Sequence, residues 1–409
     1  MTLFPLPLSQ IFGHWGAYVV FLLIGFAFGY VLEIAGFGNS RKLAAQFYFK
    51  DMTVLKVMFG AIITAMVLIF AATAIGLLDY NLLWVNPTYL WPGIVGGLIM
   101  GVGFIVGGFC PGTSLVGAAT FKLDGVFFAL GVFFGIFLFG ETVSSFNVFW
   151  NSSYLGRFTL PELFGLSTGW IVLLVVLMAL VMFLAAEQLE RIYGKKDPKK
   201  APKWRYAAAG ALIVGALVLI VIGQPTNSER WTLISSEKQA LLDDRAVQIH
   251  PGELLDLTDD NQIKVVMLDV REEVDYNLFH ILDARHITLE ELPDIISELH
   301  FEPANTVFVT MSNDETAATE AWKLLVAESV PNVYILEGGI NNWIAIFGDD
   351  DLTMTFNKGA GDDQLCYIFD SALGARNPAA EPDAHNLELE YIPKVKIEMK
   401  RAPTSGGCG

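Results

Sequence analysis

The segment of residues 108–114 interrupts a long apolar region with glycine and proline. It reads Gly108, Phe109, Cys110, Pro111, Gly112, Thr113 and Ser114. Glycine and proline break helices, so the thiol stands directly before the start of a new short helix. Unpaired backbone N–H groups at a helix start favour anions. The segment therefore predicts either a small-anion site that uses a thiol or a buried structural cysteine at a helix break.

Six stretches of the chain are apolar and long enough to cross a hydrocarbon layer of roughly 30 Å, which takes about 20 helical residues. They run from Trp15 to Ala35, Val54 to Leu78, Leu90 to Gly108, Val126 to Gly140, Thr168 to Ala186 and Tyr206 to Ile222. Hydrophobic residues make up 53% of the chain, with 30 phenylalanines. We therefore expect an α-helical polytopic membrane domain.

The break at Cys110 has a counterpart 72 residues earlier. Residues 36–38 follow the first apolar stretch as residues 108–110 follow the third. In both places a short segment of small residues, a Lys and an Asp come before the next stretch. Many transporters build a binding site near the bilayer centre from repeats with interrupted helices. The pattern predicts two broken-helix repeats.

The two segments resemble the YeeE/YedE thiosulfate-transporter family, over roughly residues 1–225. The resemblance implies short in-membrane helices and central cysteines that pass thiosulfate inward, with Cys110 as one of them. The other residues that it implicates in substrate binding are Gly108, Phe109, Pro111, Gly112, Thr113, Gly38, Asn39, Arg41 and Lys42. The chain departs from the pattern at Gly38, which occupies the position matching Cys110. A relay of several membrane cysteines is therefore not expected.

Charged side chains lie beside both breaks. Arg41, Lys42 and Lys122 either offset the charge of a dianion or anchor the cytoplasmic edge, since uncompensated charge in hydrocarbon is costly. Glu33 and Glu141 stand at the ends of apolar stretches, where they either couple protons, hold a basic partner or lie at the interface.

Charge is unevenly distributed along the chain. Residues before Pro225 carry 13 basic and 9 acidic side chains, and the remainder carries 13 and 34. The densest basic loop, residues 191–205, predicts a cytoplasmic side, which would place the C-terminal part outside the inner (plasma) membrane, in the periplasm. The lipid bilayer is the expected environment, and the acidic balance argues against a nucleic-acid partner.

After Pro225 the sequence alternates between strand-like and helix-like segments, which predicts an α/β fold with a parallel sheet. The expected strands are residues 265–268, 306–310 and 333–336, and a further strand or hairpin is expected from Leu387. The segments Leu268-Asp269-Val270-Arg271-Glu272 and Glu337-Gly338-Gly339 resemble a rhodanese. We expect domains at 1–225, 226–350 and 351–409, the second being rhodanese-like.

The resemblance also locates the loop that should carry a persulfide-forming cysteine. Met311 stands at that position, followed by Ser312, Asn313, Asp314, Glu315 and Thr316. A thioether cannot form a thiolate, and two carboxylates would repel thiosulfate. We expect no enzymatic activity, and either a docking, substrate-delivery or gating role or plain structural support.

The three cysteines lack metal-ligand spacing, so neither a metal site nor a cofactor is expected. Cys366 lies in an apolar run and is expected in the core. Cys408 lies on a Gly-rich tail, where it is either a sulfur-carrying arm, a metal ligand or an accident.

The function expected from these features is transport of thiosulfate or a related small sulfur anion past Cys110, with a sulfur-carrier protein as a candidate partner. The alternatives are a membrane-anchored sulfur carrier that uses Cys408 and a ligand sensor.

Overall fold

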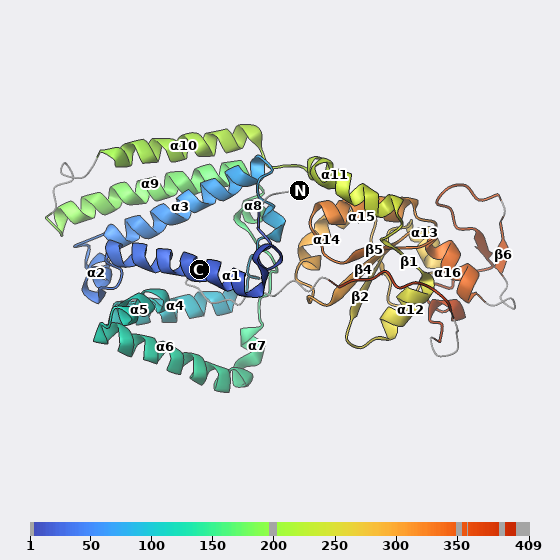
Figure 1. The fold of residues 1–409 in the computed structure, drawn as a ribbon, viewed down its shortest axis with the longest axis horizontal. Helices are drawn as coiled ribbons and strands as arrows, with labels where there is room; N and C mark the ends of the chain where they lie inside the picture. Colours follow the sequence, from blue (N-terminus) through green and yellow to red (C-terminus); the bar gives the residue numbers. More distant parts are fainter. Residues whose placement is uncertain (1–3, 196–202, 349–353, 358, 384–388, 398–409) are drawn as a thin grey trace. The chain divides into compact units, whose positions relative to one another are not determined.

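The computed structural model describes residues 4–195, 203–348, 354–357, 359–383 and 389–397. The chain divides at residue 225 into a helical N-terminal unit and an α/β C-terminal unit (Figure 1). Cys408 lies outside the described residues, so its expected role is not addressed by the structure.

Six helical segments of the described residues are long and apolar enough to cross a membrane, which confirms the predicted spans. The long helices are α1 (Leu8–Ala35), α3 (Thr53–Ala74), α4 (Leu90–Gly107), α6 (Leu123–Thr142), α9 (Thr168–Ile192) and α10 (Trp204–Ile222). Many large apolar side chains on them are exposed, Val106 and Val221 among the most. Exposed apolar side chains are suited to contact with lipid. The backbone of these helices needs no water there, because each helix satisfies its own backbone hydrogen bonds.

Some ends differ from prediction. α3 stops at Ala74, earlier than Leu78, because Gly76 adopts a left-handed φ of 71° and ends the helix. α6 is longer than predicted, at 20 residues.

Three of the long helices form a packed core of their own. Ile63 and Val67 of α3 are buried against Val172 and Val176 of α9 and against α10. Close approach of α9 and α10 requires a glycine, because a Cβ at Gly169 would lie 2.9 Å from the Ile220 Cα. The short elements of this unit are α2 (Ser40–Ala44), η1 (Ala45–Tyr48), η2 (Tyr80–Leu82), α5 (Pro111–Ala119), η3 (Val143–Phe146), α7 (Asn147–Trp150) and α8 (Leu160–Phe164).

The C-terminal unit is built on a five-stranded parallel sheet of order β1-β5-β4-β2-β3. The strands are β1 (Gln248–Ile249), β2 (Lys264–Asp269), β3 (Arg285–His286), β4 (Thr306–Met311) and β5 (Val333–Leu336). The three predicted strands are confirmed and form the centre of the sheet. The two edge strands were missed, because two residues are too short to show a period of two.

Helices cover the sheet on both sides. Helices α11 (Asn227–Asp243), α14 (Leu292–Leu299) and α15 (Thr316–Ala327) pack together, and α12 (Pro251–Asp259) packs against α16 (Gly339–Phe347). In Figure 1 the sheet lies between these two groups, and α13 (Glu273–Leu278) follows β2. The central strand β4 is buried along its whole length, as expected for a parallel sheet with both faces covered.

The strand or hairpin predicted from Leu387 was wrong for residues 389–397, which form no strand. Side chains satisfy the backbone of this segment instead: the N–H groups of Lys394 and Val395 donate to the buried Glu253 carboxylate at 2.7 and 2.8 Å. The hairpin of this region lies earlier, in β6 (Met354–Phe356) and β7 (Tyr367–Phe369), before η5 (Pro378–Ala380).

Cys366 was also predicted wrongly. It is half-buried rather than in the core, and Phe369 is the buried member of its run.

Candidate functional site

The second helix break places the Cys110 thiol at the start of α5. Gly108 takes the left-handed φ of 73° that turns the chain after α4. The Thr113 N–H donates to the Cys110 Sγ at 3.5 Å, and the Cys110 N–H donates to Thr113 Oγ1 at 2.9 Å. This capping box holds a half-buried thiol at a helix N-terminus, where backbone N–H groups favour negative charge.

The first break has the same plan with different side chains. Gly36 ends α1 with a φ of 82°. Asn39 then caps α2, its Oδ1 accepting from the Arg41 N–H at 3.0 Å. Lys42 Nζ donates to the carbonyl of Ala35 at 2.6 Å and so satisfies the C-terminal end of α1.

The two breaks meet in one hydrophobic cluster. Phe37 and Phe109, which occupy equivalent repeat positions, are both fully buried in it. Each phenylalanine is directly followed by the position at which the two repeats differ, with Gly38 in the first repeat and Cys110 in the second. The two repeated segments therefore lie next to each other in the folded domain.

Polar contacts also connect the repeats. Ser40 of α2 donates from Oγ to Asp124 Oδ2 of α6 at 2.5 Å. Backbones approach closely here, because a Cβ at Gly108 would lie 3.1 Å from the Ser40 carbonyl oxygen.

An ion pair lies beside Gly38. Lys122 Nζ donates to Glu33 Oε1 at 2.7 Å, which connects the end of α1 to the residue before α6. A Cβ added at Gly38 would lie 2.2 Å from Glu33 Oε2 and 2.9 Å from Lys122 Nζ. Of the alternatives for Glu33, the structure therefore shows a basic partner.

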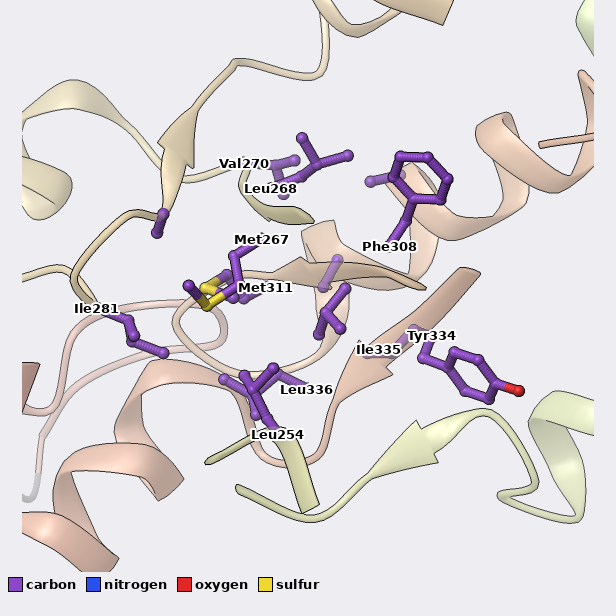
Figure 2. Packing of buried hydrophobic residues seen from close by; sticks show 14 of the residues in the cluster. Leu254, Met267, Leu268, Val270, Ile281, Phe308, Met311, Tyr334, Ile335 and Leu336 are labelled. Carbon is purple, nitrogen blue, oxygen red and sulfur yellow. The ribbon is translucent and has the colours of Figure 1, made fainter. Parts of the chain in front are cut away.

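In the C-terminal unit, Met311 is the last residue of β4. Its side chain is fully buried, and Figure 2 shows it among the core residues, near Met267. Asp269 and Arg271 form a buried pair with two hydrogen bonds, of 2.8 and 2.7 Å, and Arg271 Nη1 reaches Asn313 Oδ1 at 3.2 Å. This buried network fixes the loop that follows β4.

Two family models match parts of this chain. A family model described as "Sulphur transport" matches residues 35–238, which contain both helix breaks. The membrane domain belongs to the sulphur transport family. The YeeE/YedE resemblance is thereby confirmed, and a model of the rhodanese-like domain matches residues 250–346. Neither the curated proteins nor the solved structures gave a match.

Within the sulphur transport domain, the predicted site residues fall into buried and exposed groups. Buried or half-buried at the junction are Gly38, Lys42, Gly108, Phe109, Cys110, Pro111 and Thr113. Exposed are Asn39, Arg41 and Gly112. The contact between Ser40 and Asp124 was not predicted from the sequence. The signal for it was an acidic residue, Asp124, at the start of an apolar helix, where a polar partner is expected.

In the rhodanese-like domain, the carboxylate of Asp363 binds backbone N–H groups of the loop after β4. Asp363 accepts from the Asp314 N–H and from the Ala317 N–H, each at 3.1 Å. Asp314 accepts in turn from the N–H groups of Thr316 at 2.6 Å and Asp363 at 2.9 Å. Three backbone donors that could attract an anion in such a loop, the N–H groups of Asp314, Thr316 and Ala317, are thus bound to carboxylates.

Ser312 is also held by the structure. It is buried, and its Oγ accepts from the Ala318 N–H at 3.2 Å. Glu315 pairs with Arg245 at 2.7 Å and accepts from the Gly338 N–H at 2.7 Å. The hydrogen bonds from Arg245 to Glu315 and, to a smaller extent, to Glu337 outweigh burial and raise the pKa of the Arg245 guanidinium.

Proposed function

We propose that the sulphur transport domain moves thiosulfate, or a related small inorganic sulfur anion, across the membrane along a pathway centred on Cys110. The observation that carries this proposal is the Cys110 Sγ at the N-cap of α5, 3.2 Å from Thr113 Oγ1. A thiol, a hydroxyl and helix-start N–H groups together suit an anion with sulfur and oxygen acceptors. Gly108, Phe109, Pro111 and Gly112 shape the break that presents them.

The first repeat contributes in a different way. Gly38 lacks a side chain, Asn39 caps α2, and Lys42 bonds the end of α1. Arg41 is exposed at the same break. We propose that this repeat supplies positive charge and a helix start rather than a second thiol.

We further propose that the rhodanese-like domain is catalytically silent and serves docking or substrate delivery, with a sulfur-carrier protein as a candidate partner. Met311 stands at the nucleophile position of the motif. Two observations support its silence: the Met311 side chain is buried, and Asp363 takes up loop N–H groups. On this view residues 226–350 form the domain and residues 351–409 its extension, following a transport domain of residues 1–225.

For localisation we propose the inner (plasma) membrane, with the rhodanese-like domain on the periplasmic side. The basic loop of residues 191–205 supports this orientation. A periplasm-dependent reporter fused after Gly409 should be active, whereas activity of a cytoplasm-dependent reporter there contradicts the topology.

The deciding experiment is uptake of sulfur-labelled thiosulfate by proteoliposomes that contain the full chain. Cys110→Ala should abolish uptake, and Cys366→Ala, a half-buried thiol of the other unit, serves as the matched control. Cys408→Ala separates transport from a carrier mechanism, because only the carrier requires that thiol. Equal uptake by Cys110→Ala and the unmodified chain would refute the proposed pathway.

A further inference from the structure

Position 38 is where the first repeat lacks the thiol of the second. The space beside Gly38 is nevertheless filled, since an added Cβ would meet Glu33 Oε2 at 2.2 Å and Lys122 Nζ at 2.9 Å. The groups that lie against this position are therefore a carboxylate from the preceding helix and an ammonium group from the other repeat.

We infer that Lys122 binds the transported anion and that Glu33 holds the Lys122 ammonium group until the anion replaces it. This inference rests on the proposed transport function and adds a specificity-determining residue to it. An ammonium group has three donors, and Glu33 Oε1 takes one of them at 2.7 Å. The ligand class is a small dianion with several acceptors, which a single charged donor distinguishes from a neutral sulfur compound.

Glu33 is an incompletely satisfied counter-ion. Its Oε2 atom is buried and has no hydrogen-bond partner among the residues that the structure describes. Leaving a buried carboxylate oxygen without a donor costs free energy. Among the described residues, Lys122 is therefore the one donor that holds this side-chain carboxylate beside Gly38, and the carboxylate is free to move aside when a dianion offers acceptors to Lys122.

A second ion pair of the same unit shows the contrast. Glu190 of α9 accepts from the Met52 N–H at 2.7 Å through Oε1 and pairs with Lys56 through Oε2. The Glu190 side chain is 8% exposed, against 37% for Glu33. Both oxygens of Glu190 are thus used to fix α9 against the start of α3, which makes this pair a matched structural control.

The test compares the KM for thiosulfate uptake among Lys122→Gln, Glu33→Gln and the double variant. Lys122→Gln should raise the KM roughly ten- to hundredfold, the effect of losing one charge-assisted hydrogen bond. Glu33→Gln should lower the KM, because the ammonium group no longer has a carboxylate partner. The double variant should keep the raised KM, because it also lacks the Lys122 ammonium group.

A purely structural pair gives a different pattern, which overturns the inference: each single variant loses folded protein, and the double variant restores both yield and KM. The control variant Lys56→Gln/Glu190→Gln should change yield without changing the KM of the protein that assembles. Calorimetric titration of thiosulfate into detergent-solubilised Glu33→Gln gives a readout that does not depend on Lys122 variants folding, and an unchanged affinity there refutes the inference. Absence of uptake by the unmodified chain refutes the proposed function, whereas uptake with a KM insensitive to Lys122 refutes this inference alone.

Discussion

Asp314 and Asp363 each accept a hydrogen bond from the other's backbone: the Asp314 N–H donates to Asp363 Oδ1 at 3.1 Å, and the Asp363 N–H donates to Asp314 Oδ2 at 2.9 Å. The two residues are 49 positions apart, so the extension after β6 closes the loop after β4. Both carboxylates are thus held by backbone N–H groups of the other residue.

Asp363→Asn should loosen this loop. The variant weakens the acceptors for two backbone N–H groups, and lost bonds to a charged group cost about 1.5–3 kcal/mol. Hydrogen–deuterium exchange of residues 312–318 in the full chain in detergent should therefore accelerate. The exposed neighbour Asp362 provides the control, as Asp362→Asn should leave exchange unchanged. Equal protection in both variants would contradict the closing role of Asp363.

The same loop should weaken in acid. Burial raises the pKa of Asp314, but hydrogen bonds from the Thr316 N–H, the Asp363 N–H and the Thr316 hydroxyl outweigh burial and lower it. A carboxyl with a lowered folded-state pKa stabilises the fold above its unfolded pKa of about 3.9, and this stability is lost as the pH falls further. Exchange of residues 312–318 should increase as the pH falls below about 4, after correction for the intrinsic exchange rate. Asp314→Asn should flatten this dependence, and an unaltered pH profile would speak against Asp314 as its source.

Met311→Cys should not create a sulfurtransferase. The side chain at this position is fully buried in the core, so a thiol there would be shielded from thiosulfate, and Asp363 stays bound to the loop. The measurement is thiocyanate formation from thiosulfate and cyanide by the full chain, with Met311→Ser as the background. Turnover above that background would show that the loop opens, contrary to this account.

Gly38→Ala should impair transport. Its Cβ would lie 2.2 Å from Glu33 Oε2, so the pair with Lys122 must shift. Because the added Cβ would also lie 2.9 Å from Lys122 Nζ and displace the ammonium group, we expect the thiosulfate KM to rise by about tenfold, equivalent to about 1.4 kcal/mol. Gly97→Ala, in an α4 position with open space, should have little effect. Adding Glu33→Ala to Gly38→Ala should relieve the clash, and persistence of the full defect would indicate another cause.

Much of the fold could be predicted because it depends on local patterns. Long apolar runs specify membrane helices whatever their neighbours are, since lipid leaves no other partner for their backbone groups. Gly36 and Gly108 mark the breaks for an equally local reason, the left-handed φ that each adopts. The three central strands were likewise readable, while the segment from Leu387 was not, because its hydrogen-bond partners Glu253 and Tyr334 lie far away in the chain.

The candidate site also has one part that depends on local sequence and another that depends on long-range packing. The residues at the two breaks can be read directly from the sequence: Cys110 follows one phenylalanine, and Gly38 follows the equivalent phenylalanine. The contact of Lys122 with Glu33 beside Gly38, and the contact of Asp363 with the loop of Asp314, depend instead on how distant segments pack. Helix breaks depend on the residues at the break itself. The partner of a charged side chain depends on which distant segments pack within hydrogen-bond distance of it, and a local sequence pattern does not contain that information.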